Sequence, residues 1–85
     1  MNDKQELENL NSQKKDLSRL NLRKSNLENI NLVEAKMEQV DLSRANLKNA
    51  SMYGINLSGS NLFKTNFENA NLNNANLNNC NLLGV

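Results

Sequence analysis

Residues 70–79 contain one group of five twice, as Ala70-Asn71-Leu72-Asn73-Asn74 and then Ala75-Asn76-Leu77-Asn78-Asn79. The spacing of the large apolar residue in this group continues toward the N-terminus. Every fifth residue from position 17 to position 82 is Leu, Met or Phe: Leu17, Leu22, Leu27, Leu32, Met37, Leu42, Leu47, Met52, Leu57, Leu62, Phe67, Leu72, Leu77 and Leu82. A period of five fits neither an α-helix, with about 3.6 residues per turn, nor a strand, with two. The internal repeat therefore decides the architecture before local propensity does.

Each group of five predicts a short extended segment followed by a turn. In Ala45-Asn46-Leu47 the outer two side chains point to one side and Asn46 points to the other, as in a strand. The next two residues turn the chain, and residues that tolerate turns recur at the second of them: Asn29, Asn49, Gly54, Gly59, Asn69, Asn74 and Asn79. Corners of about 90° close a square after four groups, so we expect coils of twenty residues stacked at roughly 4.8 Å.

This pattern resembles the pentapeptide-repeat proteins, whose motif is A(D/N)LXX, and the resemblance covers residues 15–85. It implies an all-β fold, a right-handed quadrilateral β-helix of about three and a half coils with the large apolar residues inside. We expect residues 15–85 to form this solenoid, and residues 1–14 to be a separate segment at its N-terminal end.

The segment 1–14 departs from the motif and has two interpretations. Leu7 and Leu10 keep the phase, but Ser12 takes a large inward position and Lys15 a small one, so the segment can be a decayed first coil. Alternatively it is a short amphipathic helix, with acidic residues early and basic residues late as the helix dipole favours: Asp3, Glu6 and Glu8, then Lys14 and Lys15. In both cases we expect Leu7 and Leu10 to cap the open end of the solenoid.

Composition excludes several classes of function. The chain has 85 residues, a formal net charge of +1, one cysteine and no histidine, so neither a disulfide framework nor a zinc site is expected. The polar N-terminus leads into no apolar segment, and no run is long enough to span a bilayer. We therefore expect a cytoplasmic protein without membrane contact or cofactor. We expect no small-molecule ligand either, because a solid core leaves no pocket.

The C-terminal coil is the first candidate for a contact surface. The last seventeen residues carry no charge, and after Leu82 too few residues remain for a cap. Three explanations stay open: pairing with a second copy, a missing continuation, or fraying of the last coil. The outward apolar residues favour an end-to-end homodimer, with a candidate self-association patch made of Phe63, Leu82, Leu83 and Val85.

A basic edge is the second candidate. Its residues recur near one corner and could contact an anionic partner: Arg19, Arg23, Lys24, Arg44 and Lys64. It lacks interleaved aromatic residues for stacking on bases, and a solvated charged face explains it more simply, so we do not expect nucleic-acid binding. On another outward column Glu28, Lys48 and Glu68 alternate in sign, which predicts weak ion-pair stabilisation.

Two further residue types have a structural interpretation. Cys80 occupies a small inward position without a neighbouring base, so it is expected to be buried and unreactive. Asn makes up 20 of 85 residues, which indicates corners and stacked side-chain ladders such as Asn29, Asn49 and Asn69.

The sequence therefore predicts a non-enzymatic protein-interaction or structural scaffold that binds an unidentified protein or itself. It shows no activated nucleophile, paired inward carboxylates or Gly-rich phosphate loop. The family resemblance also brings an alternative, a DNA mimic that binds type II topoisomerases and protects them from quinolones. That role implies a long and strongly acidic rod, and the net charge of +1 and the short rod argue against it.

Overall fold

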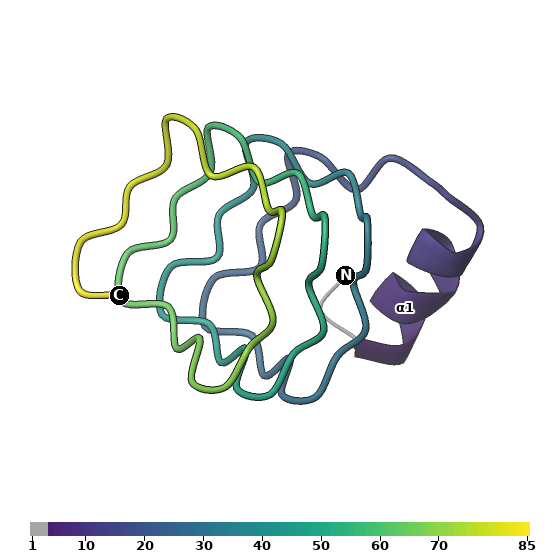
Figure 1. The fold of residues 1–85 in the computed structure, drawn as a ribbon, viewed down its shortest axis with the longest axis horizontal. Coiled ribbons are helices and arrows are strands. Elements are labelled where there is room, and N and C mark those ends of the chain that lie inside the picture. Colours follow the sequence, from purple (N-terminus) through teal and green to yellow (C-terminus); the bar gives the residue numbers. More distant parts are fainter. Residues whose placement is uncertain (1–3) are drawn as a thin grey trace.

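The computed structural model describes residues 4–85. Its helix, α1, covers Lys4–Ser12 and lies at one end of a stack of rectangular coils, with the C-terminus at the opposite end (Figure 1). The sequence-based segment 1–14 thus begins with residues outside the described part, Asp3 among them. Lys14 and Lys15 follow the end of α1, so the basic last turn expected for a helix here is wrong.

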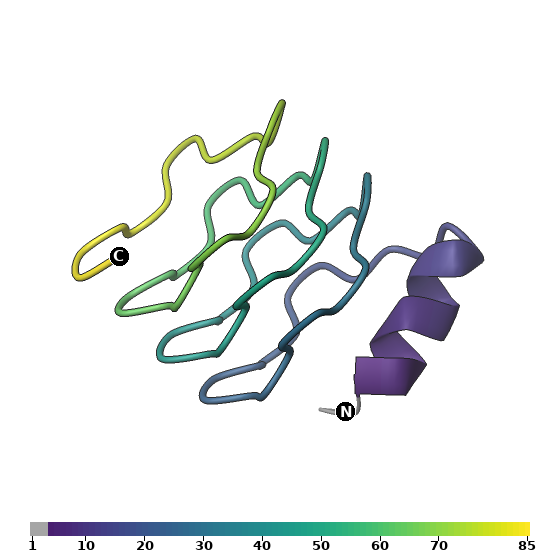
Figure 2. The same cartoon turned by 60° about the horizontal axis from the view of Figure 1, so that its bottom comes forward.

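The coils repeat every twenty residues, as the predicted columns require. Parallel β-bridges join positions twenty apart on all four sides, for example Asp16 with Lys36 and Asn61 with Asn81. Within residues 4–85 these bridges are single and extend into no longer strand, because each side is only a few residues long before the chain turns. Figure 2 shows the coils lying one above another with α1 against the first.

Most corners are β-turns that close on the large apolar residue. The amide of Ser25 donates to the carbonyl of Leu22 at 3.1 Å, and the same bond recurs at later corners. The third residue of the turn has a positive φ, as in a type II turn. It is Asn or Gly at some corners, as predicted, but it is charged at others, for example Lys24 with φ 62° and Glu34 with φ 58°.

The core is a column of apolar side chains along the axis of the stack. The large residues from Leu17 to Leu62 are buried, and the small residues beside them fill the remaining space. Leu7 of α1 is fully buried against this core, and Leu10 packs on it. In the last coil the corresponding residues are only half-buried: Phe67, Leu72 and Leu77.

Polar side chains of α1 bind the exposed backbone edge of the first coil. Lys4 Nζ donates to the carbonyl of Glu28 at 3.0 Å, and Asn11 Nδ2 donates to the carbonyl of Val33 at 3.1 Å. Glu8 Oε2 accepts the amide of Asn31 at 2.7 Å. These three side chains therefore bond to backbone groups whose equivalents in later coils bond to the preceding coil.

The interior coils show which bonds are replaced. The carbonyls of Lys48 and Tyr53, one coil above Glu28 and Val33, accept amides from the coil below at 2.9 and 2.8 Å. The amide of Ser51, one coil above Asn31, donates to the carbonyl of Ile30 at 2.9 Å. Because α1 supplies equivalent partners, these edge groups are not left exposed.

Candidate functional site

Three of the five predicted basic-edge residues form one column. Lys24, Arg44 and Lys64 each occupy the positive-φ position of the same corner in successive coils, and all three are exposed. The amide of Lys24 donates to the carbonyl of Ser43 at 2.9 Å, and that of Arg44 to the carbonyl of Phe63 at 2.8 Å. Their backbones are therefore stacked at the strand spacing of roughly 4.8 Å. We call these three residues the basic strip.

The other two residues of the predicted edge lie outside the strip. Arg23 precedes Lys24 in the same turn and is exposed. Arg19 belongs to the preceding corner, where the residues one, two and three coils above it are uncharged: Gln39, Gly59 and Asn79. The structure therefore brings together Lys24, Arg44 and Lys64, places Arg23 beside them and separates Arg19.

The ring of Phe63 contacts two cations of the strip. The guanidinium carbon of Arg44 and the ammonium nitrogen of Lys64 are each 5.3 Å from the centre of its ring. Both distances are within the range of a cation–π interaction. An aromatic residue therefore lies at this edge, although its half-buried ring contacts cations of the strip. A column analysis could have found this contact, because Phe63 follows Leu62 and lies one coil above Ser43.

The carboxylate of Asp41, which lies near the strip, is bonded within its own turn. No carboxylate in the described part of the chain lies within 4.0 Å of the three cations, and the ion pair that meets this distance joins Lys36 to Asp16 at 3.7 Å. The hydroxyl and the amide of Ser43 donate to the Asp41 carboxylate at 2.6 and 2.9 Å. Both bonds lower the pKa of Asp41 below the ordinary value, and the hydroxyl has the larger effect. The charge of Arg23 acts on that pKa in the same direction.

Among residues 4–85, Glu28, Lys48 and Glu68 form no ion pair within 4.0 Å. The side chains of this alternating column are therefore too far apart for the expected ladder of contacts. This differs from the sequence-based expectation. The backbone stacks these positions one coil apart, but long side chains on an exposed face lose rotamer freedom when they pair.

The C-terminal coil exposes both apolar side chains and backbone donors. Leu82, Leu83 and Val85 are 46%, 69% and 60% exposed, whereas Phe63, the fourth residue of the predicted patch, is half-buried against the basic strip. Across residues 4–85, the amides of four large apolar positions have no backbone acceptor: Phe67, Leu72, Leu77 and Leu82. The corresponding amides of the lower coils all donate to the coil above, for example Leu62 to the carbonyl of Asn81.

Cys80 is half-buried in this last coil, and its thiol lies 3.0 Å from the carbonyl oxygen of Leu57. Ser60 and Thr65 make the corresponding bond to the carbonyls of Met37 and Leu42. The cysteine is therefore one of a series of inward polar groups that bond to the coil below. Within the described residues, no group of three His, Cys, Asp and Glu side chains is placed to hold a metal ion.

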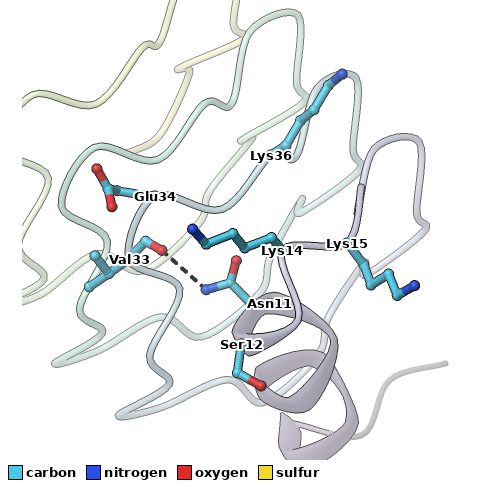
Figure 3. Close-up of a pocket in the computed structure, with 7 residues that line it drawn as sticks. All are labelled: Asn11, Ser12, Lys14, Lys15, Val33, Glu34 and Lys36. Carbon is cyan, nitrogen blue, oxygen red and sulfur yellow. Dashed lines mark hydrogen bonds between the residues drawn. The ribbon is translucent and has the colours of Figure 1, made fainter.

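An open depression of about 340 Å³ lies where α1 meets the first coil, and Figure 3 shows its lining. Asn11 bonds to the carbonyl of Val33 across its floor. The ammonium group of Lys14 points toward Val33 and Glu34, whereas those of Lys15 and Lys36 point away. The three lysines therefore do not converge on one position, as an enclosed anion site would need.

The stacked parallel bridges, the turn at every fifth residue and the continuous apolar core define a β-solenoid repeat protein. The family model described as "Pentapeptide repeats" matches residues 7–39, 16–54, 25–62 and 41–79, with eight copies. The chain belongs to the pentapeptide repeat family. Membership implies a right-handed quadrilateral β-helix, in agreement with the twenty-residue register of the bridges.

Two solved structures are similar to this chain. Rfr23, a pentapeptide repeat protein from the cyanobacterium Cyanothece 51142, is 34% identical with a TM-score of 0.66, over 84% of this chain and 55% of Rfr23. HetL, a pentapeptide repeat protein of Nostoc sp. strain PCC 7120 involved in heterocyst differentiation regulation, is 25% identical with a TM-score of 0.34, over 80% of this chain and 38% of HetL. The chain thus spans about half the length of Rfr23 and less of HetL.

No curated protein sequence matches the chain. Within residues 4–85 no helix has the length and apolar character of a membrane span.

Proposed function

We propose that this chain is a non-enzymatic interaction scaffold of about three and a half coils, capped by α1 and self-associating through its C-terminal coil. The observation that carries the proposal is the contrast between its two ends. At the first coil, α1 buries Leu7 and bonds to the backbone of Glu28, Asn31 and Val33. At the last coil, apolar side chains and backbone amides are open.

The contrast favours a closed dimer over a filament. A head-to-tail assembly would pair the last coil of one copy with the first coil of the next and would continue without limit. Because α1 occupies the first coil's edge, that contact would require its displacement. Pairing of two C-terminal coils about a two-fold axis uses the same surface on both copies and stops at two.

The non-enzymatic role is supported by the filled core and by the position of Cys80, whose thiol is directed at a backbone carbonyl. The alternative of a topoisomerase-binding DNA mimic has less support, because the net charge is +1 and the most regular exposed charge column, the basic strip, is positive. A rigid scaffold binds through preorganisation, since a fixed surface loses little conformational entropy when a partner docks.

Light scattering over a concentration series tests the self-association. We expect the intact chain to reach twice its mass of 9.6 kDa, and Leu83→Lys to remain a monomer because a charge would be buried in the interface. Val33→Lys, a matched change of an exposed apolar residue in the first coil, should dimerise like the intact chain. An intact chain that stays monomeric at all concentrations, or a Leu83→Lys dimer of unchanged affinity, would remove the proposal.

A further inference from the structure

The basic strip differs from the other charged columns because all of its charges have the same sign. Asp16 and Lys36 pair at 3.7 Å, and Glu28, Lys48 and Glu68 alternate in sign. Lys24, Arg44 and Lys64 are instead three like charges, one coil apart, with no carboxylate of residues 4–85 within 4.0 Å. Like charges at this spacing repel one another, and a bound anionic ligand would relieve the repulsion.

Two of these cations are also held in place. Arg44 and Lys64 each lie 5.3 Å from the centre of the half-buried Phe63 ring. Contact with the ring restricts both long side chains before any ligand arrives. A ligand that binds them therefore loses less side-chain entropy than one that binds free surface lysines.

Acidic residues lie on both sides of the strip, and two further cations, Arg23 and Lys48, lie among them. Asp41 lies on the side that leads into this corner, and Glu28 and Glu68 lie on the side that follows it. A wide polyanion such as a nucleic-acid duplex would meet these carboxylates as well as the cations. A single extended chain that runs along the corner, parallel to the axis of the stack, would meet the cations alone.

We propose that Lys24, Arg44 and Lys64 bind an extended acidic segment of a partner protein, with Asp or Glu at alternate positions. Side chains on one face of an extended peptide recur about every 6.6–6.8 Å, and the strip spans roughly 10 Å over two coil spacings. The Lys24 side chain, which does not contact the Phe63 ring, accommodates the difference. The inference rests on the proposed scaffold role, for which it names a class of partner.

A single-stranded nucleic acid fits the same corner less well. Binding of unpaired bases uses exposed aromatic rings as stacking platforms. Phe63 is half-buried and engaged by the two cations, and Tyr53 lies on another side of the stack, where its hydroxyl accepts a bond from Asn74 at 2.7 Å.

The test is an amide-resolved NMR titration with a blocked ten-residue peptide of alternating Glu and Ser. We expect chemical-shift changes centred on Lys24, Arg44 and Lys64, and an affinity that falls severalfold when ionic strength rises from about 0.05 M to about 0.5 M. A peptide with Gln in place of Glu should cause no such changes. The titration is repeated at two protein concentrations, so that a dependence on the oligomeric state would be seen.

The corner itself offers a substitution that removes charge and keeps the backbone. Asn occupies the same positive-φ position at Asn49, so the triple variant Lys24→Asn, Arg44→Asn, Lys64→Asn should fold, and we expect its affinity to fall at least tenfold. The control triple Lys14→Asn, Lys15→Asn, Arg19→Asn has the same net charge of −2 (+1 minus 3) and should bind within about twofold of the intact chain.

Equal loss in both triple variants would show a general charge effect and would overturn the proposal, as would unchanged binding by the strip variant. Tighter binding of a ten-nucleotide oligothymidine at the same amides would replace it with a nucleic-acid site. If the strip variant fails to fold, Lys24→Asn, which leaves the Phe63 contacts intact, should still weaken binding about threefold. A failed titration leaves the light-scattering result unaffected, so the two proposals can fail separately.

Discussion

Ser25 and Ser60 occupy equivalent inward positions of the repeat, but only one of their hydroxyl groups is hydrogen-bonded. The Ser60 hydroxyl donates to the carbonyl of Met37 at 3.2 Å and accepts the amide of Val40 at 3.1 Å, and its residue is 2% exposed. The hydroxyl of Ser25 is also buried but has no hydrogen-bond partner in the described chain. The difference follows from position, because the partner comes from the preceding coil and Ser25 belongs to the first.

The same substitution should therefore change stability in opposite directions. Ser25→Ala removes a buried hydroxyl that has lost its water partners, and should raise the free energy of unfolding by about 1 kcal/mol. Ser60→Ala leaves the Met37 carbonyl and the buried Val40 amide without this partner. An unsatisfied buried group costs about 1–3 kcal/mol, so the free energy of unfolding should fall by about that amount.

Urea unfolding followed by circular dichroism measures both effects. With an m-value of about 1 kcal/mol/M, a change of 1 kcal/mol moves the midpoint by about 1 M, provided that m itself is unchanged. Ser58→Ala is the control, because this residue lies in a turn outside the core and should shift stability by less than about 0.5 kcal/mol. Midpoints that move the same way for Ser25→Ala and Ser60→Ala would refute the assignment of stability to hydroxyl pairing.

Three further outcomes test the fold. Leu57→Ala, in the fully buried core, should lower the free energy of unfolding by about 2–5 kcal/mol in the same urea assay, and Leu82→Ala, already 46% exposed, by less than about 1 kcal/mol. Gly59→Ala should cost about 1–2 kcal/mol, because φ there is +73° and Ala is strained in that region. Asp41 has a depressed pKa in the folded chain, so its stabilisation is present above its unfolded pKa and is lost as pH falls through the folded value. Ser43→Ala should raise the Asp41 pKa in a carbon-detected NMR titration and reduce this acid-side loss of stability; an unchanged pKa would count against the hydroxyl as its main cause.

The five-residue period predicted the register of the solenoid because inward packing imposes it at every side. The columns derived from Leu17 and Leu22 correspond to the bridges of Asp16 with Lys36 and Asn21 with Asp41. The period also predicted where the chain turns. It did not predict that charged residues such as Lys24 and Glu34 adopt positive φ, because local propensity disfavours this and the stacked coils impose it.

The role of Asn was predicted only in part. The Asn before each large residue mostly bonds to its own turn: the Asn46 side-chain oxygen accepts the amide of Lys48 at 3.0 Å. Between described residues, a side-chain bond of the expected ladder type joins Asn81 to Asn61 at 3.4 Å, and the column of Asn29, Asn49 and Asn69 shows none. The bond within the turn forms in preference to the bond between coils because it spans only three residues and needs no neighbouring coil.

The candidate contact surfaces depended on side-chain direction, which the period does not specify. Phe63 was predicted in the C-terminal patch because it lies below Leu83 on the same column, whereas its ring contacts the cations at the corner. Which interpretation holds for the N-terminal segment was likewise open in the sequence. Both keep Leu7 inward, and only the backbone shows that residues from Lys4 to Ser12 form a helix.

The three side-chain bonds from α1 also affect which register the coils adopt when the chain folds. Fourteen nearly interchangeable groups of five offer many shifted pairings, each of which moves the core residues by one side and keeps them inward. Lys4, Glu8 and Asn11 reach three particular backbone groups, on Glu28, Asn31 and Val33. A shift of one group would pair them with different residues of the coil. The helix thus distinguishes one winding from its neighbours, a choice that the uniform repeats alone leave nearly degenerate.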